Sequence, residues 1–195
     1  MGKPRLSPLP KSEWDPEIQD LFEKIGYETE EDLYNVLKTL AHHPKLLKRW
    51  LPFANHVLLK STLTPRIREV VILRTGWLCG SEYEWTQHVR IAKEEAAMNM
   101  ADFSALEIGS KDPHWGNEER IALKLCEDLF AFRTVRESTW KELIQYFDHK
   151  QVLDMVAAVG NYTMVSMMLN TFQVPLDSWL EKYEAFGVGA LRSKI

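Results

Sequence analysis

One residue suited to chemistry is a glutamate, Glu69, that heads an otherwise apolar helix face. With about 100° of rotation per residue, Glu69 shares this face with Ile72 and Leu73. Burial raises the pKa of a carboxyl group, and a carboxyl group tuned in this way can act as a general acid or base near neutral pH. The alternative is a glutamate near a helix start that favours the helix dipole and pairs with Arg66 or Arg68.

A histidine, His88, stands at the border of the apolar face on the next predicted helix. Glu84 precedes it by one helical turn on the same face, and Trp85 and Val89 belong to the apolar stripe beside it. A glutamate four residues before a histidine can fix the orientation of the imidazole ring and raise its basicity, as a catalytic histidine requires. The alternative is a half-exposed pair that stabilises the helix by roughly 0.2–0.5 kcal/mol.

The elements that must position these residues are all predicted to be helices, because apolar residues recur at helical spacing and no alternating strand pattern occurs. The expected helices cover residues 15–25, 30–41, 44–59, 65–79, 82–98, 102–108, 117–132, 138–147, 149–171 and 176–185. Helices 65–79 and 82–98 should pack as an antiparallel pair, because only two or three residues connect them.

The domain organisation follows from proline placement and from the absence of a linker. Three prolines near the start predict an extended arm over residues 1–14, because proline disfavours helical backbone at the preceding residue. Residues 15–195 are predicted to form a single all-α domain. The helix at 149–171 is apolar nearly all round, so we expect a homo-oligomer in which a second copy covers part of it.

The composition excludes several function classes. The 195 residues carry 24 Lys and Arg against 28 Asp and Glu, and this balance without a basic run argues against a nucleic-acid partner. The two cysteines, Cys79 and Cys126, form no disulfide framework and no cluster at metal-ligand spacing, so no metal is expected. No signal peptide or membrane span is expected either, which predicts a cytoplasmic protein that does not contact a membrane.

The two helices together resemble the carboxymuconolactone decarboxylase family, which includes the AhpD-like alkylhydroperoxidases. The resemblance is strongest over residues 53–106 and rests on the segments 66–74 (RIREVVILR) and 79–88 (CGSEYEWTQH). It implies an AhpD-like helical bundle that assembles as a trimer, hexamer or dimer, with a pocket near the subunit interface.

The cysteine positions separate the branches of this family. In the peroxidase branch a glutamate lies nineteen residues before the histidine of a C-x-x-C-x-x-x-H motif. Glu69 and His88 keep that spacing, whereas Ser81 and Glu84 stand at the two cysteine positions. Neither side chain can form a sulfenic acid or a disulfide, so an alkylhydroperoxidase-like thiol peroxidase is the least favoured interpretation.

The decarboxylase-like branch is the better match, and it implies a cofactor-free enzyme. Its chemistry would be proton transfer, as decarboxylation, lactone conversion or isomerisation, on a small organic acid or lactone. The resemblance assigns catalysis to Glu69 and His88, with Tyr83 as a possible proton donor. The expected substrate-pocket residues are Ser81, Glu84, Trp85 and Trp77.

A non-catalytic protein of the same fold, which binds an apolar ligand or serves as an assembly unit, is the alternative. An enzyme should place Glu69, His88 and Tyr83 around one water-filled pocket. A binding protein should instead show a dry pocket and a Glu69 paired with an arginine. For an enzyme site at the border of the core, Glu69→Gln is expected to lower stability by about 1 kcal/mol at most.

Overall fold

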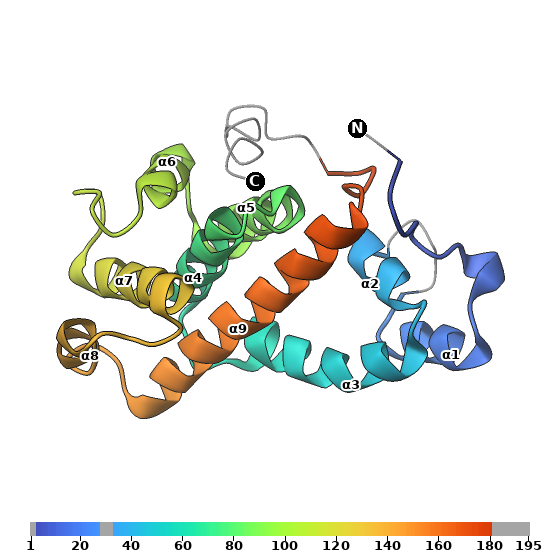
Figure 1. The fold of residues 1–195 in the computed structure, drawn as a ribbon, viewed down its shortest axis with the longest axis horizontal. Helices are drawn as coiled ribbons and strands as arrows, with labels where there is room; N and C mark the ends of the chain where they lie inside the picture. Colours follow the sequence, from blue (N-terminus) through green and yellow to red (C-terminus); the bar gives the residue numbers. More distant parts are fainter. Residues whose placement is uncertain (1–2, 28–32, 181–195) are drawn as a thin grey trace.

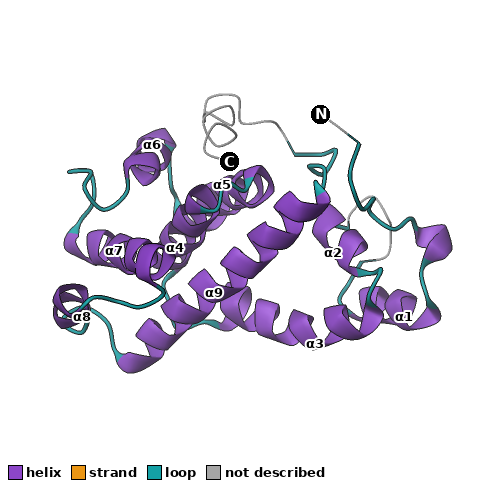
Figure 2. Ribbon diagram, in the orientation of Figure 1, coloured by secondary structure: helices purple, strands orange, loops and turns teal. Residues whose placement is uncertain are grey.

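The computed structural model describes residues 3–27 and 33–180, and this part of the chain is helical without a strand (Figure 2). The prediction of an all-α fold is thereby confirmed. The α-helices are α1 (Pro16–Lys24), α2 (Asn35–Leu40), α3 (Pro44–Asn55), α4 (Pro65–Leu78), α5 (Glu82–Ala96), α6 (Met100–Ile108), α7 (Asn117–Phe132), α8 (Glu137–Leu143) and α9 (His149–Phe172). A 3₁₀ turn, η1 (Lys11–Glu13), and a π-helical segment, η2 (His56–Lys60), complete the elements.

The helix α4 forms the centre of the fold. It begins at Pro65, where the side chain of Thr64 accepts a hydrogen bond from the Ile67 amide, and proline suits the first helical position. All of its residues from 67 to 77 are buried, because α5, α6, α7 and α9 pack around it. The predicted pairing of α4 with α5 is confirmed, and Figure 1 shows the two helices side by side.

The long helix α9 separates two groups of helices. In Figure 1 it crosses the middle of the molecule, with α4, α5 and α7 on one side and α1, α2 and α3 on the other. The helices α1 to α3 have an apolar core of their own, which includes Ile18, Phe22, Leu33 and Leu47. This arrangement leaves one face of α5 and one face of α9 turned toward the α1–α3 group.

The N-terminal arm is attached to both groups. The amides of Arg5 and Leu6 donate to the Phe172 carbonyl at the end of α9, and the Leu9 amide donates to the Lys38 carbonyl of α2. Residues 3–10 form no helix, and η1 follows them before α1.

The expected helix at 176–185 is wrong over its described part, because residues 174–180 form turns and irregular backbone. Gln173 adopts a left-handed conformation (φ 54°), and the Val174 amide returns to the Leu169 carbonyl, which closes α9. Asp177 then accepts a hydrogen bond from the Asn35 amide at the start of α2. Residues 181–185 of this prediction lie outside the described residues.

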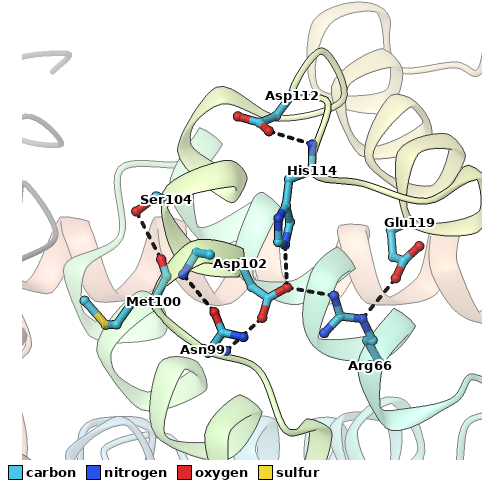
Figure 3. A network of polar contacts seen from close by, with 9 residues as sticks. Arg66, Asn99, Met100, Asp102, Ser104, Asp112, His114 and Glu119 are labelled. Carbon is cyan, nitrogen blue, oxygen red and sulfur yellow. Dashed lines mark hydrogen bonds and ion pairs between the residues drawn. The ribbon is translucent and has the colours of Figure 1, made fainter.

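A polar network fastens α6 and α7 to α4 (Figure 3). The Arg66 guanidinium donates to Asp102 at 2.7 Å and to Glu119 at 3.0 Å, and His114 Nε2 lies 2.8 Å from the same Asp102 oxygen. Burial raises the pKa of Asp102, but the hydrogen bonds from Arg66 and His114 outweigh it and lower the pKa overall. Asp102 also accepts from the Asn99 amide, so one carboxylate joins the cap of α6 to the core.

The exposed face of α9 predicts self-association. Leu153 and Met167 are 69% and 61% exposed, and Val156 on the same helix and Phe132 on α7 are exposed as well. Among the described helices α9 is long and apolar enough to cross a bilayer, but half of its most apolar window is buried within the fold. We expect light scattering to give a multiple of 22.7 kDa. A mass of one chain at micromolar concentration would contradict this expectation.

Candidate functional site

A cavity of about 650 Å³ lies between the α1–α3 group and the pair α5 and α9. Its lining is mainly apolar, and α5 contributes the ionisable side chains of Tyr83, Glu84 and His88. The lining residues are Leu21, Ile25, Tyr27, Tyr34, Val36, Leu37, Lys48, Trp50, Leu51, Pro52, Ala54, Asn55, Leu58, Leu59, Tyr83, Glu84, Gln87, His88, Ile91, Asn161, Tyr162 and Val165. The volume is within the range of small-molecule sites.

The His88 imidazole is held by Glu69 from behind the cavity wall. His88 Nδ1 donates to Glu69 Oε2 at 2.8 Å, which leaves Nε2 for the cavity side. Burial lowers the pKa of His88, but the charge and hydrogen bond of Glu69 and the charge of Glu84 outweigh it and raise the pKa. Glu69 therefore fixes the orientation of the imidazole and favours its protonated form.

Glu69 is fully buried and does not line the cavity. Its other oxygen accepts from Arg68 Nε at 2.8 Å, and Arg68 Nη2 also donates to Glu95 at 2.6 Å. Burial raises the pKa of Glu69, but the charge and hydrogen bond of His88 and those of Arg68 outweigh it and lower the pKa. Glu69 thus stays ionised and orients His88.

Glu84 is the buried carboxylate that faces the cavity itself. Its carboxylate makes no hydrogen bond with any residue in the described ranges. The Glu84 Oε2 atom lies 3.6 Å from His88 Nε2, which is longer than a hydrogen bond. Burial and the charge of Glu69 raise the pKa of Glu84 to about 7, although the charge of His88 lowers it. Glu84 therefore exchanges a proton near neutral pH. The sequence placed it in the pocket but did not give it this role.

The short connection between α4 and α5 positions Glu84. Ser81 caps α5, because its side chain accepts a hydrogen bond from the Glu84 amide. Gly76 on α4 faces this first turn, and a Cβ added there would lie 3.4 Å from Glu84 Cβ. Glu84 and His88 follow one helical turn apart and so reach the same cavity. Ser81 itself is buried and does not line the cavity, contrary to the prediction.

Tyr83 lines the cavity, but its hydroxyl is bound elsewhere. It donates to Asp177 Oδ2 at 2.6 Å and accepts from the Val36 amide at 3.2 Å. The side-chain amide of Gln87 donates to the same Asp177 oxygen. Burial and the charge of Asp177 raise the pKa of Tyr83 well above its usual value. The hydroxyl predicted to donate a proton to substrate is thus held in a structural cluster.

The two tryptophans predicted to line the pocket lie elsewhere. Trp85 is completely buried in the core between α4 and α6, with its ring centroid 5.1 Å from that of Trp77. Trp77 borders a second cavity, of about 620 Å³, on the far side of α4. Helical periodicity identified the apolar face of α5, but this face packs against α4, in a core cluster that α6 also joins, rather than against the cavity.

Tyr162 is the cavity residue that the sequence analysis missed. Its ring meets the His88 ring edge to face at 4.8 Å between centroids. Its hydroxyl makes no hydrogen bond with the described part of the chain, and burial together with Glu84 and Glu69 raises its pKa well above the usual value. The only signal was its place on a helix that is apolar all round.

The comparisons with known proteins agree with this geometry. Residues 44–128, which contain Glu69, Glu84 and His88, match the profile of the carboxymuconolactone decarboxylase family. This part of the chain is similar to that family. No curated protein matches the sequence significantly.

Solved structures of this kind share the fold. An uncharacterized peroxidase-related protein from Silicibacter sp. TM1040 superposes with a TM-score of 0.75 at 19% identity, covering 91% of this chain and 96% of the other. The alkylhydroperoxidase AhpD core of a peroxidase-related protein from Ralstonia eutropha JMP134 gives 0.72 at 19% identity, covering 91% and 95%. The debrominase Bmp8 gives 0.69 at 15% identity, covering 89% and 92%. These likenesses establish an AhpD-like fold for the chain.

The two cysteines of this chain do not line the cavity that contains Glu84 and His88. Cys79 borders the second cavity, and burial raises its pKa; Cys126 is buried, and burial raises its pKa to about 12. Since the thiolate is the reactive form, we expect no thiol-dependent hydroperoxidase activity. The measurement is peroxide consumption with a dithiol reductant, compared between wild type and Cys79→Ser. Robust turnover that Cys79→Ser abolishes would overturn this expectation.

The raised pKa of Glu84 predicts a pH-dependent stability. The pKa of this carboxyl is near its ordinary value of 4.5 in the unfolded chain and is raised to about 7 in the folded protein. The contribution of Glu84 to the free energy of unfolding is therefore fully present below about pH 4.5 and is lost as the pH rises through 7. The loss amounts to roughly 3 kcal/mol. Urea unfolding should show that the free energy of unfolding of Glu84→Gln rises relative to that of wild type between pH 5 and pH 8.

A surface variant serves as the control for this comparison. Glu13→Gln on the exposed η1 turn should follow wild type at both pH values. An equal pH dependence in wild type and Glu84→Gln would show that Glu84 ionises normally in the folded protein.

Proposed function

We propose that this protein is a cofactor-free enzyme that catalyses proton transfer, as an isomerisation or a decarboxylation, in the cavity between α5 and α9. The observation that carries the proposal is the placement of Glu84. A buried carboxylate without a hydrogen bond from the described chain, with a pKa of about 7, lies 3.6 Å from a histidine that a second carboxylate holds. Such a group suits general acid and base catalysis at neutral pH.

The three ionisable groups have separate roles in this proposal. Glu84 carries the proton, because both of its forms are populated near pH 7. His88 presents Nε2–H to the cavity and stabilises negative charge that develops on a substrate oxygen. Glu69 is a positioning residue, because it contacts His88 at 2.8 Å and does not line the cavity.

The proposed reaction begins at a carbon next to a carbonyl group. Glu84 accepts the proton from this carbon, and the C–H electron pair moves toward the carbonyl oxygen to give an enolate. His88 donates a hydrogen bond to the enolate oxygen. If a C=C bond lies next to this carbon, the enolate extends over it as a dienolate. Protonated Glu84 then returns the proton to the far carbon of the former C=C bond, which shifts the double bond and completes an isomerisation. In a β-keto acid, loss of CO₂ gives the same enolate, and protonated Glu84 supplies the proton that replaces it.

A second candidate function is binding of an apolar ligand without catalysis. The observation that favours it is the ion pair between Glu69 and Arg68, together with an apolar lining on most sides of the cavity. A Glu69 paired with an arginine is the arrangement expected from the sequence for a binding protein. The pair does not compete with the proposed chemistry, however, because Glu69 reaches Arg68 and His88 with different oxygens.

The test is a screen for proton exchange. The protein is incubated in D₂O with small ketones, lactones and β-keto acids, and the products are followed by mass spectrometry and CO₂ release. We expect deuterium at the carbon next to the carbonyl, with a rate that rises through about pH 7 as Glu84 ionises. Ligand binding without exchange or CO₂ release across the screen would favour the binding function.

A further inference from the structure

We infer that this cavity takes an uncharged, largely apolar molecule of one or two rings that presents an O–H or N–H donor to Glu84, rather than a carboxylate anion. The inference deepens the proposed function, on which it rests for the identity of the site, and it favours isomerisation of an uncharged substrate over decarboxylation of an acid. It differs from the small organic acid that the family resemblance implies.

The charges around the cavity oppose a bound anion. Glu84 faces the cavity, and Glu69 and Asp177 lie directly behind its wall. The charge of His88 is compensated by a carboxylate on each side, at 2.8 Å and 3.6 Å. A carboxylate ligand would add a further buried negative charge, and an unpaired buried charge costs several kcal/mol.

Lysine at the mouth does not offer an anion site. Lys48 is the one Lys or Arg among the described lining residues, its side chain is 59% exposed, and its Nζ already lies 2.6 Å from Glu17. An exposed ammonium group with its own carboxylate partner adds little to the binding of a buried anion. Apart from His88, whose charge two carboxylates already balance, the described lining therefore lacks the cation that recognition of a carboxylate requires.

Unsatisfied acceptors remain at the site, beside the donors His88 Nε2 and the Tyr162 hydroxyl. The Glu84 carboxylate accepts no hydrogen bond within the described ranges. Gln87 Oε1 is also buried without a partner in these ranges, whereas the amide nitrogen of the same side chain donates to Asp177. A buried acceptor without a donor costs about 1–3 kcal/mol. A ligand O–H or N–H that donates a charge-assisted hydrogen bond to Glu84 would remove this cost for the Glu84 carboxylate.

The aromatic lining presents apolar surface because its polar ends are bound elsewhere. Trp50 Nε1 donates to Asn161 Oδ1 at 2.8 Å, and the Tyr83 hydroxyl donates to Asp177. Together with Leu51, Leu58 and Val165, these rings form walls that favour a flat apolar body. Shape and polarity thus agree on an apolar ring with one donor.

Three probes of the same ring size test the inference. The probes are β-naphthol, which has a donor, its methyl ether, which has none, and β-naphthoate, which is an anion. Calorimetry at pH 8, where Glu84 is mostly ionised, should show β-naphthol binding about ten-fold or more tightly than either of the others. Glu84→Leu should remove the preference of β-naphthol over its ether.

Lys48→Met is the matched control, since it removes the charge at the mouth of the cavity. It should leave the three affinities within about two-fold of wild type, because a screened surface charge contributes little. Tightest binding of β-naphthoate, equal binding of all three probes, or no binding of any probe would overturn the inference.

The outcomes for the ligand and for the reaction are separable. A preference for β-naphthol in a protein that exchanges no deuterium would support the ligand class and refute the proposed catalysis. Deuterium exchange in a protein that prefers β-naphthoate would support the catalysis and refute the ligand class.

Discussion

Replacing Glu84 with glutamine should slow turnover by about 10²–10⁴-fold, with the fold retained. Glutamine has the shape of glutamate but cannot accept or return a proton. In this variant His88 and its partner Glu69 remain in place, so substrate binding should change much less than kcat. Since Glu84 ionises near pH 7 in the wild type, the variant should also lose the rise of rate through that pH.

The control for this variant lies on the same helix. Glu94 on α5 is exposed and pairs only with Arg90 among the described residues, so Glu94→Gln should retain wild-type rates. The measurement is the pH profile of kcat and kcat/KM for any substrate found in the exchange screen. Wild-type kcat in Glu84→Gln would remove this carboxylate from the mechanism and leave His88 as the remaining candidate base.

Replacing Glu69 with glutamine should destabilise the protein by about 3 kcal/mol at pH 7. Glu69 is completely buried and accepts from both Arg68 and His88, so the amide would leave one buried donor facing another. The expectation from sequence, about 1 kcal/mol at most, assumed a carboxylate at the edge of a pocket. Because Glu69 is buried in an ion pair with Arg68, the larger loss of stability is the expected one.

Glu95→Gln is the matched control, because it removes the other carboxylate partner of Arg68. Glu95 is 47% exposed, so this variant should cost less than about 1 kcal/mol. Urea unfolding measures both variants. Because the pKa of Glu69 is lowered in the folded protein, its contribution is present above the unfolded pKa and is lost as the pH falls through the folded one. The difference between wild type and Glu69→Gln should therefore shrink in acid, and equal costs for both variants at pH 7 would contradict this account.

The contact between Glu69 and His88 could be predicted because it depends on local geometry. Two helices joined by a three-residue connection must pack side by side, and the apolar pattern fixes which faces meet. The family resemblance added the spacing of nineteen residues between the two side chains. The structure gives 2.8 Å for this pair.

The rest of the site depends on contacts between distant segments, which periodicity does not encode. Tyr83 and its partner Asp177 are 94 residues apart, and Trp50 and Asn161 are 111 residues apart. The apolar stripe that contains Trp85 shows that a face is buried but not which helix buries it. For the same reason the sequence could not show that α1 to α3 would cover Glu84 and raise its pKa.

The hydrogen bonds of Asp177 have a consequence for the order in which the site is assembled. The helix α2 has six residues, too few to persist alone, and the carboxylate that binds its first amide follows 142 positions later. During synthesis from the N-terminus, the wall that α2 contributes therefore waits for the segment beyond α9 to emerge. Until then Glu84 and His88 would lack the cover that Val36 and Leu37 of α2 give to their cavity.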